Sequence, residues 1–136
     1  MSASESKQIA ARAAQALFND KDLSQIDTLF AESFVDHSAP EGAPQGRAGQ
    51  RAKVEGFIAA FPDLQITYSH QIAEGDLVSG RFVLSGTHHG DFAGVDATGN
   101  TISLVGHDLL RVVDGQIVEH WTVIDSAELM RQLGVQ

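Results

Sequence analysis

The chain has 136 residues, no cysteine and a formal net charge of −9, and each of these properties excludes a class of protein. The length fits a single domain over residues 1–136, and the lack of cysteine excludes disulfides, thiolate metal sites and a cysteine nucleophile. An acidic surface repels phosphate, so neither nucleic acid nor an anionic membrane is an expected partner. The sequence carries no recognisable signal peptide or apolar membrane span, so we expect a cytoplasmic protein.

The N-terminal half has the apolar spacing of helices. Residues 4–18 and 19–34 each carry apolar side chains at intervals of three or four, which predicts two helices. Residues 35–46 contain two of the three prolines and predict a loop. Residues 47–61 predict a third helix, which ends before Pro62 because proline cannot continue it.

After Pro62 the apolar period shortens to about two residues, which is typical of strands. The predicted antiparallel strands are residues 64–72, 77–90, 101–113 and 116–125, with a longer connection over residues 91–100. Residues 126–134 predict a closing helix that ends at Gly134. This order predicts an α+β domain with helices packed on one side of a sheet.

Six segments of this chain form a recognisable set of motifs: FVDHSAP (34–40), AFPDL (60–64), AEGDLVSGRFVLSGTHHGDFAG (73–94), ATGN (97–100), LLRVVDGQIVEHW (109–121) and LMRQLG (129–134). With these motifs the chain resembles the SnoaL-like polyketide cyclases, also called ester-cyclase-like proteins, of the NTF2-like superfamily. The resemblance implies an NTF2-like cone-shaped barrel, with N-terminal helices packed on a strongly curved, mostly antiparallel sheet. It also implies a homodimer or higher homo-oligomer.

The same resemblance implies an activity. Characterised cyclases of this family act on small hydrophobic carbonyl compounds and close a ring by intramolecular aldol condensation, without a metal or an organic cofactor. One aspartate near the end of the last long strand acts as acid and base, and the matching position in this chain is Asp125. The resemblance therefore implies a cofactor-independent cyclase of lyase or isomerase type.

Asp125 ends a predicted strand in which alternate residues share a face. Ile117, Glu119, Trp121 and Val123 share its face, so an inward orientation would surround the carboxyl group with apolar side chains and raise its pKa. A raised pKa suits a group that abstracts a proton and later returns it. The alternative is that Asp125 only caps the following helix, since aspartate is a favoured N-cap.

Three histidines could assist this aspartate. His107 and His37, named as catalytic candidates, could stabilise an enolate oxygen or orient Asp125. His88, a substrate-binding candidate, shares the strand face of Phe82. For each of the three, a packed structural role stays open, whereas His70, His89 and His120 are expected to face outward or to lie at an interface.

The remaining candidates would contact the substrate. They are Trp121, Phe82, Phe34, Glu119 and Arg81. Trp121 would supply a flat wall or pack in the core. Glu119 would need a cationic partner, for which Arg111 and Arg81 are the candidates.

A metal site is not predicted. Adjacent His88 and His89 point to opposite faces of a strand, and the sequence has no His-x-His pair and no helical metalloprotease motif. A site assembled in three dimensions from His37, His88 and His107 stays open.

Two other functions compete with cyclisation. The first is an epoxide hydrolase-like or ketosteroid isomerase-like acid–base enzyme, although epoxide opening calls for several polar groups around one water. The second is a non-catalytic NTF2-like domain that binds a small ligand. In that case Asp125 would be a cap or an ion-pair partner.

Overall fold

Five strands form one mixed sheet in the order β1-β5-β4-β3-β2 in the computed structural model, which describes residues 2–135. The strands are β1 (Phe30–Asp36), β2 (Gln65–Glu74), β3 (Leu77–Thr87), β4 (Thr101–Val113) and β5 (Gln116–Ile124). β1 runs parallel to β5, and every other neighbouring pair is antiparallel. The α+β class is confirmed, but the sheet is neither strongly curled nor closed, so the cone-shaped barrel is a wrong prediction.

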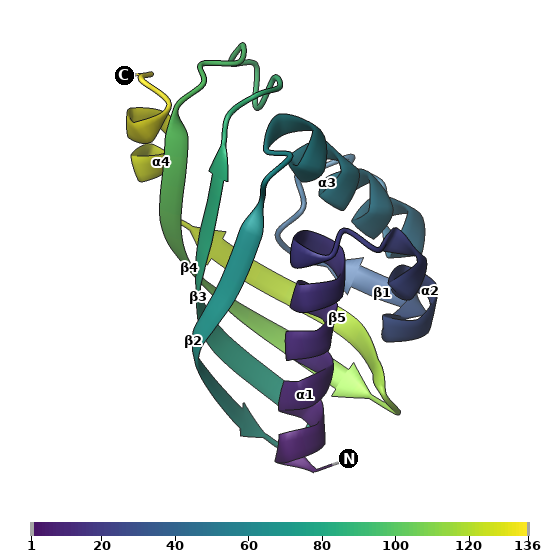
Figure 1. Ribbon diagram of the computed structural model, residues 1–136. Helices are drawn as coiled ribbons and strands as arrows, with labels where there is room; N and C mark the ends of the chain where they lie inside the picture. The colour runs from purple at the N-terminus through teal and green to yellow at the C-terminus, as the bar shows by residue number, and fades with distance from the viewer. Residues whose placement is uncertain (1, 136) are drawn as a thin grey trace.

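Helices α1 (Ala3–Ala14), α2 (Ile26–Leu29) and α3 (Gly46–Ala60) lie on one face of this sheet (Figure 1). A π-helical turn (Gln15–Asn19) extends α1, and a 3₁₀ turn (Leu23–Gln25) leads into α2. Two clusters of buried apolar side chains fill the space between the helices and the sheet. No helix within residues 2–135 is both long enough and apolar enough to cross a bilayer.

The second predicted helix is partly wrong, because residues 30–34 belong to strand β1. Phe30 and Phe34 are both buried and meet edge to face at 4.9 Å. Their spacing of four residues suits one face of a helix and one face of a strand equally well. Pairing with β5, which is distant in the sequence, decides in favour of the strand.

Helix α4 (Ser126–Gln132) covers an edge that β5 leaves open. β5 pairs with β4 only from Gly106 onward, so the first residues of β4 have no strand on that side. The Gln132 side chain takes the place of a strand there: Ser103 N donates to its Oε1 at 2.7 Å, and its Nε2 donates to Ser103 O at 3.0 Å. Covering an unpaired edge in this way prevents pairing with another chain.

A β-bulge in β5 determines which of its side chains face the helices. Arg111 pairs with Glu119, whereas the next residue, Val112, pairs with Ile117, so Val118 is an extra residue. An extra residue reverses the alternation of the side chains that follow it. After the bulge, the even-numbered residues of β5 share the inner face with Ile117.

Candidate active site

A cavity of about 130 Å³ lies between the inner face of the sheet and helices α1 and α3. We call it the inner cavity. Its wall is mostly apolar, with alanines from α1 and aliphatic and aromatic side chains from every strand. The polar or charged residues in the wall are Gln50, Lys53, Tyr68, Asp108, His120 and Thr122.

A larger cavity of about 810 Å³ adjoins the first and is called the outer cavity. It is lined by residues 38–40 and 43–45 of the loop after β1, by helix α3 and by Phe92 in the connection between β3 and β4. The residues that line both cavities are Gln50, Lys53, Phe57, Thr122 and Ile124. We call these five residues the neck, because a ligand that occupied both cavities would pass them.

Asp108 and Tyr68 form a pair in the wall of the inner cavity. The Tyr68 hydroxyl group donates a short hydrogen bond to Asp108 Oδ2. Asp108 is only 7% exposed, and burial raises the pKa of its carboxyl group, with the hydrogen bond from Tyr68 opposing the rise. Burial also raises the pKa of Tyr68, and the adjacent carboxylate adds to that rise. The pair therefore favours the protonated, uncharged forms of both side chains.

Asp36, at the end of β1, differs from Asp108 because its surroundings favour the charged form. Burial by itself would raise its pKa. Three neighbouring groups outweigh the effect of burial. They are His120 Nδ1, at 3.7 Å from Oδ1, Lys53 Nζ, at 3.0 Å from Oδ2, and the Ser38 amide, at 3.0 Å from Oδ1. Together they lower the pKa of Asp36 well below its usual range, so the carboxylate is charged.

His120 lies between these two carboxyl groups. It pairs across the sheet with Asp36 on β1 and with Leu110 on β4. Asp108 pairs with Thr122, so His120 and Asp108 are diagonal neighbours on the inner face. An imidazole ring that lies 3.7 Å from a charged carboxylate, and diagonal to a carboxyl group whose pKa is raised, can accept a proton and return it.

Of the nine predicted site residues, Phe82 lines the inner cavity and Phe34 lines the outer one. Asp125 is exposed and caps α4, where its Oδ1 accepts a hydrogen bond from Glu128 N at 2.9 Å. The prediction that it faces inward in line with Ile117 is wrong, because the bulge at Val118 reverses the alternation between them. Asp125 lines neither cavity.

His37, Glu119 and Trp121 come together outside both cavities. The His37 ring stacks on the Trp121 ring with centroids 4.6 Å apart, and His37 Nε2 lies 2.8 Å from Glu119 Oε2. Arg111 Nε donates to Glu119 Oε1 at 2.9 Å, so Arg111 is confirmed as the partner of Glu119. The three candidates thus form a cluster that fixes the start of the loop after β1.

The other predicted residues also lie away from the cavities. His107 is exposed, and Arg81 donates to Ser69 Oγ at 3.0 Å. His88 is fully buried, and its Nδ1 accepts a hydrogen bond from Thr98 N at 3.1 Å. Outward orientation is confirmed for His70 and His89, which are exposed. The expectation that His120 lies outside is wrong. The bulge that turns Asp125 outward turns His120 inward, so that it lines the inner cavity.

Sequence reasoning missed Asp108 although the signal was present. In β4 the inward positions are Ile102, Leu104, Leu110 and Val112, and Asp108 has the same parity. A carboxylate in the apolar phase of a strand costs free energy unless it is protonated or paired. The neighbouring His107, which the motif position favours, lies on the opposite, exposed face of β4.

Metal ligation finds no support in this arrangement. Among the side chains of residues 2–135, no group of three or more His, Asp or Glu residues is close enough to hold an ion. The three-histidine site that the sequence left open is therefore not assembled.

The chain belongs to the SnoaL-like polyketide cyclase family, whose sequence model matches residues 8–133. AclR from Streptomyces galilaeus is 37% identical over 98% of each chain, with a TM-score of 0.84. IdmH from Streptomyces antibioticus is 36% identical over 96% of this chain and 99% of its own, with a TM-score of 0.83.

TsrD from Streptomyces laurentii is 25% identical over 100% of this chain and 99% of its own, with a TM-score of 0.91. A sequence comparison with curated proteins gives no match.

Proposed function

We propose that this protein is a cofactor-independent enzyme of polyketide-cyclase type that closes a ring in a small hydrophobic carbonyl compound by intramolecular aldol addition. One observation carries the proposal. His120 lies at an apolar cavity between Asp36, whose pKa is lowered, and Asp108, whose pKa is raised. Titratable groups whose pKa values are pushed apart in one site are typical of acid–base catalysis.

In the proposed reaction His120 is the base. It removes a proton from the carbon next to a carbonyl group, and the electrons of that C–H bond form an enolate. The protonated Asp108 and the Tyr68 hydroxyl group donate hydrogen bonds to the enolate oxygen, where the negative charge develops. The charged Asp36 stabilises the imidazolium ion that forms.

Ring closure follows without loss of atoms. The enolate carbon attacks a second carbonyl carbon of the same molecule, a C–C bond forms, and the new alkoxide takes the proton from His120. The proton that left carbon is therefore returned to oxygen. Holding the two reacting ends together in the cavities supplies up to roughly 7–11 kcal/mol, the range for well-oriented intramolecular reactions.

A double-bond shift is the second candidate. A carboxylic acid kept neutral by apolar surroundings, beside a tyrosine, is the donor pair that ketosteroid isomerase uses to stabilise a dienolate. Asp108 and Tyr68 have the same chemistry here. Both candidate reactions begin with the same proton abstraction, and the nature of the product separates them. IdmH is described as a candidate polyketide cyclase and AclR as a candidate hydroxylase. The family match and the likeness to IdmH favour cyclisation over a double-bond shift, and a site suited to proton transfer favours it over hydroxylation.

Exchange of carbon-bound protons tests the shared first step without the natural substrate. 1-Tetralone is incubated in D₂O with the protein, and deuterium uptake next to its carbonyl group is followed by NMR. We expect exchange faster than in buffer, a loss of about 10²–10⁴-fold in His120→Gln and a loss of about 10²–10³-fold in Asp108→Leu.

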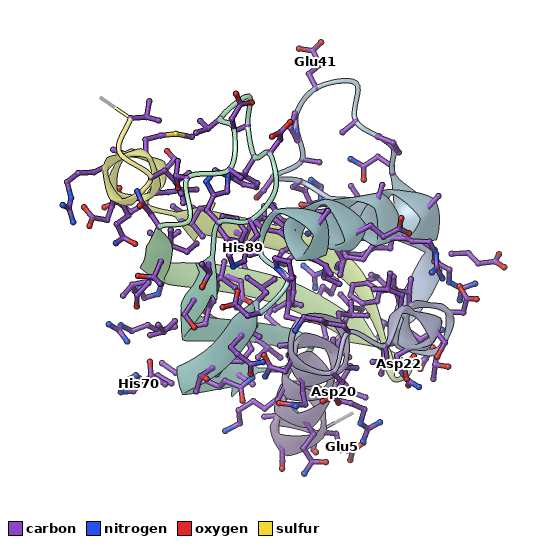
Figure 2. The ribbon with its side chains drawn as sticks, turned by 45° about the horizontal axis from the view of Figure 1, so that its top comes forward. Glu5, Asp20, Asp22, Glu41, His70 and His89 are labelled. Atoms are coloured by element: carbon purple, nitrogen blue, oxygen red, sulfur yellow. The ribbon has the colours of Figure 1, made fainter. Side chains whose placement is uncertain are left out.

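His70→Gln is the matched control, because His70 is exposed on β2 and points away from the molecule (Figure 2). It should exchange like the wild type. Exchange in the wild type at the buffer rate, together with measurable binding of 1-tetralone, would favour a non-catalytic ligand-binding domain instead.

A further inference from the structure

Gln50 on α3 occupies an unusual position in the neck. Only 6% of the residue is exposed, and it lines both cavities. Its Oε1 atom is buried and has no hydrogen-bond partner among residues 2–135. Val54, one turn further along the same face of α3, is fully buried and apolar. An aliphatic side chain at position 50 would thus suit the packing of this helix face.

A buried amide oxygen without a partner costs free energy, because its desolvation is not compensated by a hydrogen bond. That cost disappears when a bound molecule offers a hydrogen-bond donor. Of the other neck residues, Phe57 and Ile124 are apolar, whereas Lys53 Nζ donates to Asp36 Oδ2 and Thr122 Oγ1 donates to His107 O. Asp108 Oδ1 is the second buried oxygen without a partner in the wall of the inner cavity. The apolar cavity therefore has two unsatisfied polar positions.

The volumes indicate how a ligand would be divided between the cavities. The inner cavity, about 130 Å³, is close in size to an engineered apolar cavity of about 150 Å³ that holds one benzene molecule. It can accept one ring or a short chain, and the rest of a larger molecule would extend through the neck into the outer cavity. The outer cavity, about 810 Å³, is within the range of roughly 300–1,000 Å³ that is usual for whole small-molecule ligands.

We propose that Gln50 is a specificity-determining residue that recognises a hydroxyl group on the ring held in the inner cavity. The inference rests on the proposed function, because it takes the inner cavity as the place where the reacting end of the substrate binds. It names the substrate class more narrowly: a hydrophobic carbonyl compound with a terminal, hydroxyl-bearing ring, whose remaining part lies in the outer cavity. A hydroxyl group can pair with either end of an amide, so recognition does not depend on which end of the Gln50 amide faces the ring.

Two probes of the same shape test this role. Toluene and p-cresol differ by one hydroxyl group, and both fit a one-ring cavity. Their dissociation constants are measured by NMR titration for the wild type and for Gln50→Met, which keeps the side-chain length and removes the amide. We expect p-cresol to bind the wild type about fivefold or more tightly than toluene, the equivalent of about 1 kcal/mol.

In Gln50→Met this preference should fall to about twofold or less, while toluene binds as well as before. Retained toluene binding shows that the variant is folded. Gln8→Met is the matched control, because Gln8 is exposed on α1, and it should keep the preference of the wild type. The side-chain amide signals of Gln50 should shift with p-cresol and not with toluene.

An unchanged preference in Gln50→Met would overturn the role of Gln50. Failure of both probes to bind the wild type would overturn the one-ring inner cavity. Neither result touches the acid–base proposal, which is tested by proton exchange in the His120 and Asp108 variants. Conversely, the wild type could fail to catalyse exchange while Gln50→Met still loses the hydroxyl preference. Gln50 would then be a recognition residue of a non-catalytic binding domain.

Discussion

Tyr68 on β2 reaches Asp108 on β4 by passing over Gly80 on the strand between them. Gly80 is the register partner of both Gln71 on β2 and Asp108 on β4. An added Cβ at position 80 would overlap the Tyr68 ring and would lie 3.2 Å from Asp108 Oδ1. The missing side chain is therefore what allows the hydroxyl group and the carboxyl group to meet across two strand spacings.

Gly80→Ala should accordingly disrupt the pair. The added methyl group overlaps the ring, and overpacking of this kind costs about 1–3 kcal/mol of unfolding free energy. Urea unfolding measures the cost, and the 1-tetralone exchange rate should fall with it. In a Tyr68→Leu background no ring lies over position 80, so the same substitution should cost much less there. An equal cost in both backgrounds would contradict the packing described.

Asp108→Asn should change how stability depends on pH. Because burial raises the pKa of Asp108 above 3.8, the folded protein holds this proton to higher pH than the unfolded chain does. The stability from this proton is present at low pH and is lost as pH rises through the folded-state pKa. Each pKa unit of the shift corresponds to about 1.4 kcal/mol.

We therefore expect Asp108→Asn to gain stability relative to the wild type as pH rises from about 4 to 7 in urea unfolding. Asp114→Asn, on an exposed turn, controls for the loss of a negative charge. A difference between Asp108→Asn and the wild type that stays constant over this range would show that Asp108 titrates normally.

Asp36→Asn should show the opposite dependence. Its lowered pKa means that the contribution to stability is present above pH 3.8 and is lost as pH falls below that value toward the folded-state pKa. The variant loses the ion pair with Lys53, and hydrogen bonds to charged groups contribute about 1.5–3 kcal/mol. Unfolding at pH 7 should reveal a loss of that size, and the gap should narrow in acid. A gap that widens below pH 4 would refute the assignment.

The sequence could predict more of the fold than of the site, for a reason that particular residues show. Helices and antiparallel strands depend on local periodicity, and α1, α3 and β2 to β5 were found close to their predicted positions. Strand β1 and the inward turn of His120 depend on contacts distant in the sequence: parallel pairing with β5 and the bulge at Val118. A bulge exchanges the faces of odd and even residues, and the alternation before the bulge gives no sign of it. The inward orientation of Asp108 could be predicted, because no bulge precedes it in β4.

Val105→Glu tests the homodimer that the family resemblance implies. Val105 is 42% exposed on the face of β4 that points away from the helices. A charge there would be costly in an interface between two copies and harmless in water. We expect sedimentation to show a dimer for the wild type and a monomer for the variant. Val113→Glu, at a valine 40% exposed near the end of β4, is the matched control. A dimer that survives Val105→Glu would place the interface elsewhere.

Substitutions of Asp125 separate its capping contact from the catalytic role that the family resemblance implies. The Asp125 carboxylate accepts a hydrogen bond from the Glu128 amide, so Asp125→Ala should lower the unfolding free energy by about 1 kcal/mol. Asp125→Asn should lower it less, because asparagine caps a helix nearly as well. Neither change reaches the cavities, so both variants should exchange 1-tetralone protons at the wild-type rate. If Asp125→Asn instead lost exchange as severely as His120→Gln while keeping its stability, proton transfer would belong to the end of β5 and the assignment to His120 and Asp108 would fail.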